Sequence, residues 1–139
     1  MINLPDYKKI HCIGIGGIGL SAIAEILLSR GYEVSGSDMR ESEMTERLIE
    51  QGARIYLGHR AKNVDDVDLV IYSSAIGKDN PELARADERG IPAITRAQAL
   101  GVLMDEYRNS IAVSGTHGKT TTTSMVSLIL KEAQKEPTI

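Results

Sequence analysis

The chain has 139 residues, enough for one ordinary domain of about 100–150 residues and the beginning of another. Its composition, 42% hydrophobic and 25% charged, is typical of a globular protein, and its core must be aliphatic because Phe and Trp are absent. A net charge of −3 with mixed signs argues against a nucleic-acid surface. No segment is apolar enough for a signal peptide or a membrane span, so we expect a cytoplasmic protein. Cys12 lies in an apolar run and is expected in the core.

Short β-branched runs alternate with longer helical stretches from Lys9 onward, which predicts an α/β fold with a Rossmann-like parallel sheet and flanking helices. The expected strands are residues 10–15, 32–38, 53–58, 68–75 and 91–95. The expected helices are residues 18–30, 43–52, 81–89 and 96–107. A sixth strand at 111–115 is expected to lead through a Gly-rich turn into a helix over 118–135, which divides the chain into domains 1–108 and 109–139.

The stretch GIGGIG, residues 14–19, joins the first expected strand to the first expected helix with the spacing Gly14-x-Gly16-x-x-Gly19. Glycines at such a joint let a phosphate approach the free N–H groups and the positive end of the helix dipole. Packing alone also places glycines there, so the pattern by itself is weak. Asp38 ends the second strand, where dinucleotide-binding folds place a ribose-binding carboxylate. An NAD(P)-dependent oxidoreductase therefore stays open, as does a turn-capping role for Asp38.

A second stretch, SGTHGKTTTT, also has the character of a phosphate loop. The strict P-loop spacing G-x-x-x-x-G-K-[ST] fails because Val113 stands where its first glycine belongs. Its second half is present, with Lys119 able to reach terminal phosphates and the Thr120 hydroxyl able to bind Mg²⁺. Four consecutive threonines form helices poorly, which favours a need for their hydroxyl groups.

Four further residues lie at or after the ends of expected strands. Ser73 and Ser74 lie at the C-terminal end of the fourth strand, at the edge where open parallel sheets bind ligands, and this position favours a function. His59 and Asn63 follow the third strand, and from composition a solvated turn is the better interpretation for this pair.

The order of GIGGIG, GSD, GHRAKNV, SSAI, ITRAQAL and SGTHGKTTTT closely resembles the N-terminal part of the Mur ligases, over essentially the whole chain. These are ATP-dependent amide ligases of peptidoglycan synthesis. The histidine in GTHGKT together with GIGGIG is most similar to the branch that joins L-alanine to UDP-N-acetylmuramic acid. A murein tripeptide ligase is the alternative within the family.

The resemblance implies that the first loop binds the UDP-sugar and that the second begins an ATPase domain. In such ligases ATP phosphorylates the lactyl carboxylate, and the amine of L-alanine attacks the resulting acyl phosphate. The implied UDP-sugar contacts are Gly16, Gly17, Ile18, Gly19, Asp38, His59, Asn63, Ser73, Ser74, Ile76 and Arg96. The implied ATP contacts are Gly115, Thr116, His117, Gly118, Lys119, Thr120 and Thr121, with Lys119 and Thr120 catalytic and Thr120 on Mg²⁺.

The chain stops at Ile139, soon after the second loop, so the resemblance implies an N-terminal fragment that is inactive alone and lacks the residues selecting L-alanine. Elements built to join a larger sheet would lack their cover, and we expect self-association or domain swapping through residues 109–139. A regulatory nucleotide-binding module is a third interpretation, from a different functional class.

Overall fold

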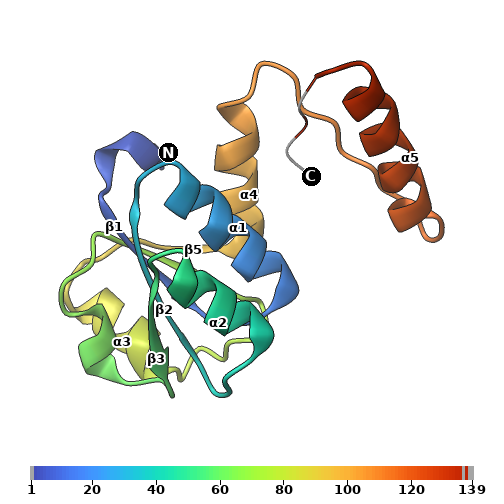
Figure 1. Cartoon of the computed structure of the whole chain (residues 1–139). Helices are drawn as coiled ribbons and strands as arrows, with labels where there is room; N and C mark the ends of the chain where they lie inside the picture. Colours follow the sequence, from blue (N-terminus) through green and yellow to red (C-terminus); the bar gives the residue numbers. More distant parts are fainter. Residues whose placement is uncertain (1, 136, 138–139) are drawn as a thin grey trace. The chain divides into compact units, whose positions relative to one another are not determined.

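The structure, a computed structural model, describes residues 2–135 and 137. It contains two compact units, one extending to Glu106 and the other beginning at Tyr107. The first unit holds a five-stranded sheet in the order β3-β2-β1-β4-β5, with every pair of neighbours parallel (Figure 1). The parallel α/β sheet predicted from the sequence is confirmed.

The strands and helices lie close to their expected positions. The strands are β1 (Lys9–Ile13), β2 (Glu33–Asp38), β3 (Arg54–Leu57), β4 (Leu69–Tyr72) and β5 (Ala93–Thr95). The α-helices are α1 (Ile18–Ser29), α2 (Glu43–Glu50), α3 (Pro81–Glu88), α4 (Arg96–Asp105) and α5 (Lys119–Glu132). Two short 3-10 helices are η1 (Leu4–Asp6) and η2 (Ala61–Val64). Within residues 2–135, no helix has the length and apolar character needed to cross a bilayer.

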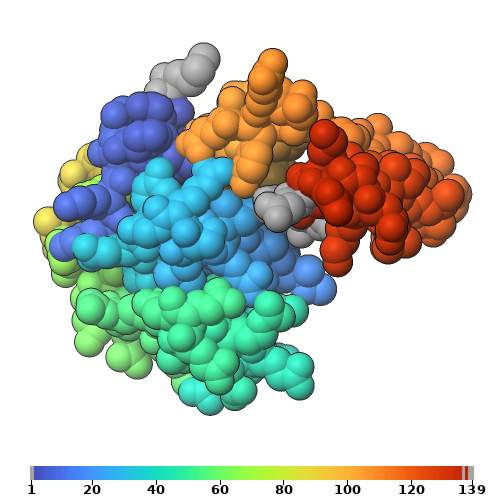
Figure 2. Space-filling model, turned by 45° about the horizontal axis from the view of Figure 1, so that its top comes forward, coloured from blue at the N-terminus to red at the C-terminus, as the bar shows by residue number. Residues whose placement is uncertain are grey.

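Both faces of the sheet are covered, which explains why its central strand is buried from Ile10 to Ile13. Ile10 and Cys12 point to the face covered by α1, α2 and α4, whereas Ile13 points to the face covered by η2 and α3. Figure 2 shows α1 and α2 side by side on the outside of the first face. Cys12 is completely buried, as expected, and burial raises the pKa of its thiol to about 12.

Side-chain caps fix where three of the helices begin. Ser42 and Thr45 form a capping box at the start of α2, and Thr95 and Gln98 form another at the start of α4. The Asn80 side chain accepts N–H groups of the first turn of α3, whose first residue is a proline that has no N–H to satisfy. These caps hold the loops that enter the helices in defined positions.

The sixth strand expected at 111–115 is wrong for the described residues: this segment forms no strand and belongs to no sheet. An apolar run becomes a strand only where another strand satisfies its N–H and C=O groups. Ile111, at its start, is 62% exposed. Helix α5, which follows, contains no buried residue.

Gly36 in β2 gives a direct test of this packing. A Cβ atom there would lie 2.5 Å from Ile15 Cδ1 and 2.7 Å from the Cys12 carbonyl oxygen, whereas a Cβ on Gly101 in α4 would meet nothing within 4 Å. We expect Gly36→Ala to lower the free energy of unfolding by about 1–3 kcal/mol, measured by urea denaturation. Gly101→Ala is the matched control and should stabilise by up to about 1 kcal/mol through helix propensity. Equal effects of the two changes would contradict the packing described.

Candidate functional site

The glycine loop between β1 and α1 is fastened to the end of β2. The Ser37 carbonyl accepts the N–H groups of Gly14 at 2.8 Å and Ile15 at 3.1 Å. Gly14 has a φ of +82°, which suits glycine, and a Cβ there would lie 3.4 Å from both Ser73 Cβ and Ile76 Cδ1. The structure therefore brings the glycine loop, Ser73 and Ile76 together at the carboxyl edge of the sheet.

The amides of the loop differ in whether they have partners inside the chain. Gly16 N–H donates to Asp38 Oδ2 at 2.9 Å, and Gly17 N–H donates to the Gly14 carbonyl at 3.1 Å. The N–H groups of Ile18 and Gly19, in the first turn of α1, donate to no residue that the structure describes. They are the donors that this helix end offers to a ligand.

Arg96 lies against this same helix end. A Cβ on Gly19 would be only 2.9 Å from Arg96 Nη1, so the absence of a side chain at 19 makes room for the guanidinium. Arg96 is exposed and makes no hydrogen bond or ion pair with the described residues. A cation beside the positive end of a helix is electrostatically unfavourable on its own, and a bound anion would remove the conflict.

On the other face of the sheet, a fully buried carboxylate gathers donors from four elements. Glu82 in α3 has no exposed surface. Its Oε1 accepts from His11 Nε2 at 3.2 Å and Asn63 Nδ2 at 2.7 Å. Its Oε2 accepts from Ser37 Oγ at 2.6 Å and His59 Nδ1 at 2.9 Å. The solvated turn expected for His59 and Asn63 is therefore wrong, because the Glu82 carboxylate draws both side chains inward.

Burial by itself raises the pKa of the Glu82 carboxyl. The hydrogen bonds from His11, Ser37 and Asn63 together lower the pKa by more than burial raises it, so the net pKa lies below its ordinary value of 4.5. Glu82 is thus ionised at neutral pH. Sequence reasoning did not find Glu82, Ser37 or His11. The available signal was His11, a histidine inside an apolar strand, which needs a buried partner.

Ser74 is exposed, one residue beyond Ser73 at the same edge. The Ser73 hydroxyl accepts the N–H of Ala75 at 3.3 Å, so it shapes the turn after β4.

The second loop belongs to the other unit. Gly118 has a φ of +77° and precedes α5, and Lys119 Nζ donates to the Gly115 carbonyl at 2.6 Å. The first N–H group of the helix that donates to a preceding carbonyl is that of Thr122, which donates to the Gly118 carbonyl at 2.9 Å. The N–H groups of residues 119–121 donate to none of the described residues, so this helix end can also take an anion.

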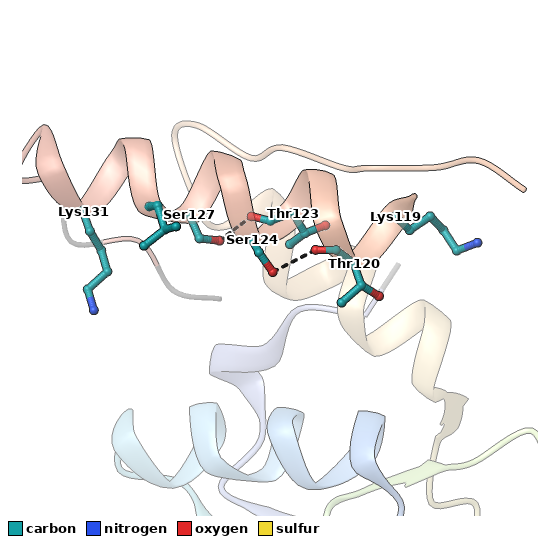
Figure 3. A pocket seen from close by; sticks show the side chains of 7 residues that line it. Lys119, Thr120, Thr123, Ser124, Ser127 and Lys131 are labelled. Atoms are coloured by element: carbon teal, nitrogen blue, oxygen red, sulfur yellow. Dashed lines mark hydrogen bonds between the residues drawn. The ribbon is translucent and has the colours of Figure 1, made fainter. Parts of the chain in front are cut away.

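One side of α5 forms a shallow depression (Figure 3). The lining residues are Lys119, Thr120, Thr123, Ser124, Ser127, Leu128 and Lys131. The hydroxyls of Ser124 and Ser127 already donate to carbonyls one turn earlier, at 2.9 and 2.7 Å. Because both hydroxyl groups already donate within the helix, the N-terminal end at Lys119 and Thr120 is the end suited to phosphate. Among the described residues no cluster of three His, Cys, Asp or Glu side chains offers a metal site.

Comparison with known proteins bears on both loops. The model of the Mur ligase family, catalytic domain, matches residues 9–108, which run from β1 through α4. The chain belongs to the Mur ligase family. Within it, a UDP-N-acetylmuramate–L-alanine ligase of Alkaliphilus metalliredigens is 54% identical over 99% of this chain and 30% of its own length. The same-named protein of Acetivibrio thermocellus is 55% identical over all of this chain and 30% of its length.

Solved structures agree with these relatives. The UDP-N-acetylmuramate-alanine ligase MurC of Thermotoga maritima matches with a TM-score of 0.84 and 44% identity, over 93% of this chain and 30% of that one. A murein peptide ligase of Psychrobacter arcticus has a TM-score of 0.85 at 31% identity, over 91% of this chain and 27% of that one. The chain is similar throughout to the N-terminal part of MurC-type ligases, and it spans about 30% of the curated relatives named above.

The buried carboxylate generates a prediction about stability in acid. Because the folded pKa of Glu82 lies below 4.5, its contribution is present above that pH and is lost as the pH falls through the lowered pKa. We expect Glu82→Gln to cost about 2–4 kcal/mol of unfolding free energy at pH 7, since an amide cannot accept from all four donors. Urea denaturation at pH 7 and pH 3.5 measures the difference.

The gap between the wild type and Glu82→Gln should narrow in acid. Hydrogen bonds from Arg85 and from the Lys9 amide lower the pKa values of Asp65 and Asp68, respectively. Both residues are present in both proteins, so their contribution to the loss of stability in acid is the same in each. A gap that stays constant between the two pH values would show that folding does not lower the pKa of Glu82.

Proposed function

We propose that the first unit binds the diphosphate of UDP-N-acetylmuramic acid at the carboxyl edge of its sheet. The observation that carries this proposal is that the amides of Ile18 and Gly19 and the nearby guanidinium of Arg96 all lack a partner among the described residues. The guanidinium lies beside Gly19 at the start of α1, and a diphosphate supplies the negative charge and the acceptor oxygens that these groups lack. Gly16 and Gly17 join them only if the ligand displaces their present acceptors.

The other proposed UDP-sugar contacts differ in what their side chains can still do. Ser73 and Ile76 lie against Gly14 of the loop, and together with Ser74 they are proposed to enclose the ligand. Asn63 is only 6% exposed and spends its amide on Glu82 and the Gly58 carbonyl, so it acts by shaping the site. Asp38 acts on the ligand through the Gly16 amide that it now occupies.

In the whole protein, the proposed reaction joins L-alanine to UDP-N-acetylmuramic acid at the expense of ATP, as the names of the relatives indicate for those proteins. The chain contributes the sugar-nucleotide domain, 1–108, and the first part of an ATP-binding domain, 109–139. ATP as co-substrate makes the cytoplasm the proposed compartment. Self-association through residues 109–139 stays a prediction; Met125, Leu128 and Ile129 in α5 are each 60% exposed or more.

The second loop is the proposed ATP site, formed by Gly115, Thr116, His117, Gly118, Lys119, Thr120 and Thr121. The amides of residues 119–121 surround the phosphates, and Lys119 exchanges the Gly115 carbonyl for a phosphate oxygen. Mg²⁺, held by the Thr120 hydroxyl and by phosphate oxygens, would neutralise charge on the transferring phosphoryl group. Lys119 and Thr120 have the proposed catalytic roles, which are electrostatic.

Titration of the chain with UDP-N-acetylmuramic acid, UDP and NADH, by calorimetry, tests the first site. We expect the two uridine nucleotides to bind and NADH to give no response. Arg96→Ala should weaken UDP binding about 10- to 100-fold, the loss of a charge-assisted hydrogen bond. Arg54→Ala, an exposed arginine at the opposite end of the sheet, is the matched control and should bind as the wild type does. Binding of NADH without UDP would favour an oxidoreductase instead.

The second site is tested by ATP with Mg²⁺. Lys119 and Lys131 lie at opposite ends of the α5 depression (Figure 3), so they form a matched pair. Lys119→Ala should weaken ATP binding at least about tenfold, because it removes the cation that faces the terminal phosphates, and Lys131→Ala should not. Fluorescence titration with a labelled ATP analogue measures both. Equal losses would contradict a site at the start of the helix.

A further inference from the structure

His59 connects the buried Glu82 carboxylate with the surface. Its Nδ1 lies 2.9 Å from Glu82 Oε2 and 2.9 Å from Ser37 Oγ. Its Nε2 has no hydrogen-bond partner among the described residues. No buried side-chain nitrogen or oxygen in the described part of the chain lacks a partner, and the His59 side chain is 15% exposed. The unpartnered Nε2 is therefore the atom that reaches solvent.

The carboxylate decides where the proton of the neutral ring resides. An ionised carboxylate only accepts hydrogen bonds, so the ring nitrogen that faces it must carry the hydrogen. The Ser37 hydroxyl donates to the same Glu82 oxygen, which leaves its own oxygen able to accept from His59 as well. With the hydrogen on Nδ1, the neutral ring presents a lone pair on Nε2.

The segment that holds the glycine loop of the proposed UDP-sugar site also holds His59. Gly58, the residue before His59, donates its N–H to the Asp38 carbonyl at 2.7 Å, and Asp38 in turn accepts the Gly16 amide of the glycine loop. The Ser37 carbonyl holds that loop while its hydroxyl contacts His59. One short segment at the end of β2 thus positions both the loop and the imidazole.

We propose that Glu82 is a positioning residue: by keeping the hydrogen of His59 on Nδ1, it presents Nε2 as an acceptor to a hydrogen-bond donor on the nucleoside half of the ligand. A diphosphate at neutral pH carries acceptors and cannot pair with this lone pair, whereas the imide N–H of uracil can. A ribose hydroxyl offers the same donor chemistry. The inference rests on the proposed function, since it concerns the same UDP-sugar site.

The tautomer itself is measurable without a ligand, by ¹⁵N NMR of the histidine rings in the wild-type chain. We expect His59 with hydrogen on Nδ1. In Glu82→Gln the side-chain oxygen must face the Asn63 donor, so the new NH₂ group faces His59 and moves the hydrogen to Nε2. A wild-type ring protonated on Nε2 overturns the proposal, as does a folded Glu82→Gln variant with the wild-type tautomer.

Binding of UDP, CDP and inorganic pyrophosphate to the wild type and to His59→Ala provides the second test, which does not depend on the stability of Glu82→Gln. We expect His59→Ala to weaken UDP about 3- to 10-fold, the value of one hydrogen bond, and to leave pyrophosphate unchanged. CDP, whose ring N3 carries no hydrogen, should bind the wild type more weakly than UDP and be insensitive to His59→Ala. If His59→Ala weakens the binding of UDP and CDP equally, the hydrogen-bond donor is a ribose hydroxyl, and the positioning role of Glu82 still holds.

The outcomes separate this inference from the function on which it rests. If UDP binds equally to the wild type and to His59→Ala, the acceptor role of His59 is overturned while the UDP site stands. If pyrophosphate loses affinity in parallel with UDP, His59 acts on the phosphates and the inference is also overturned. If the wild type binds neither UDP nor pyrophosphate, the proposed function itself fails.

Discussion

A single negative charge buried against the sheet organises the candidate site. The Glu82 carboxylate, sealed from solvent, needs a hydrogen-bond donor on each of its lone pairs, because an unpaired buried charge costs several kcal/mol. The chain supplies donors from β1, β2, the loop after β3 and η2. Segments far apart in sequence are thereby hydrogen-bonded to the same carboxylate, and these bonds make the carboxyl edge of the sheet rigid.

Ser37 transmits this constraint to the glycine loop. Its hydroxyl belongs to the buried network, and its carbonyl accepts two amides of the loop that begins α1. Side chains alternate between the faces of a strand, and this alternation allows one residue of β2 to serve the interior and its neighbour Asp38 to serve the loop. The loop is therefore shaped before any ligand arrives, which lowers the entropy cost of binding.

Electrostatically, the edge combines two positive features with one negative group. The start of α1 and the Arg96 guanidinium are both positive, and in the structure the Asp38 carboxylate already accepts one of the loop amides. An incoming diphosphate gains the free amides and the guanidinium but repels Asp38. The balance favours a ligand whose remaining half offers contacts of another kind, such as a nucleoside beside His59. The second unit has simpler chemistry, a helix start with one lysine.

The sequence by itself determined the architecture of the first unit. Apolar runs of strand length, separated by helical periodicity and glycine stops, leave a parallel sheet as the way to bury both faces, and the observed strands fall inside the expected ranges with one exception. Lys9, the first residue of β1, lies one position before its range. Motif order was equally informative, because GIGGIG followed by GTHGKT resembles the Mur ligases, and the model of that family matches residues 9–108.

Tertiary structure alone decided the interior of the site. Glu82 appears in the sequence as one acidic residue in a polar helix, and only folding reveals that its side chain turns inward to meet His11, His59 and Asn63. The segment 111–115 shows the converse, since its apolar residues predict a strand but no neighbour pairs with it in the described chain. The physical reason is the same in both cases. Periodicity reports which face of an element is apolar, whereas hydrogen-bond partners come from residues distant in sequence.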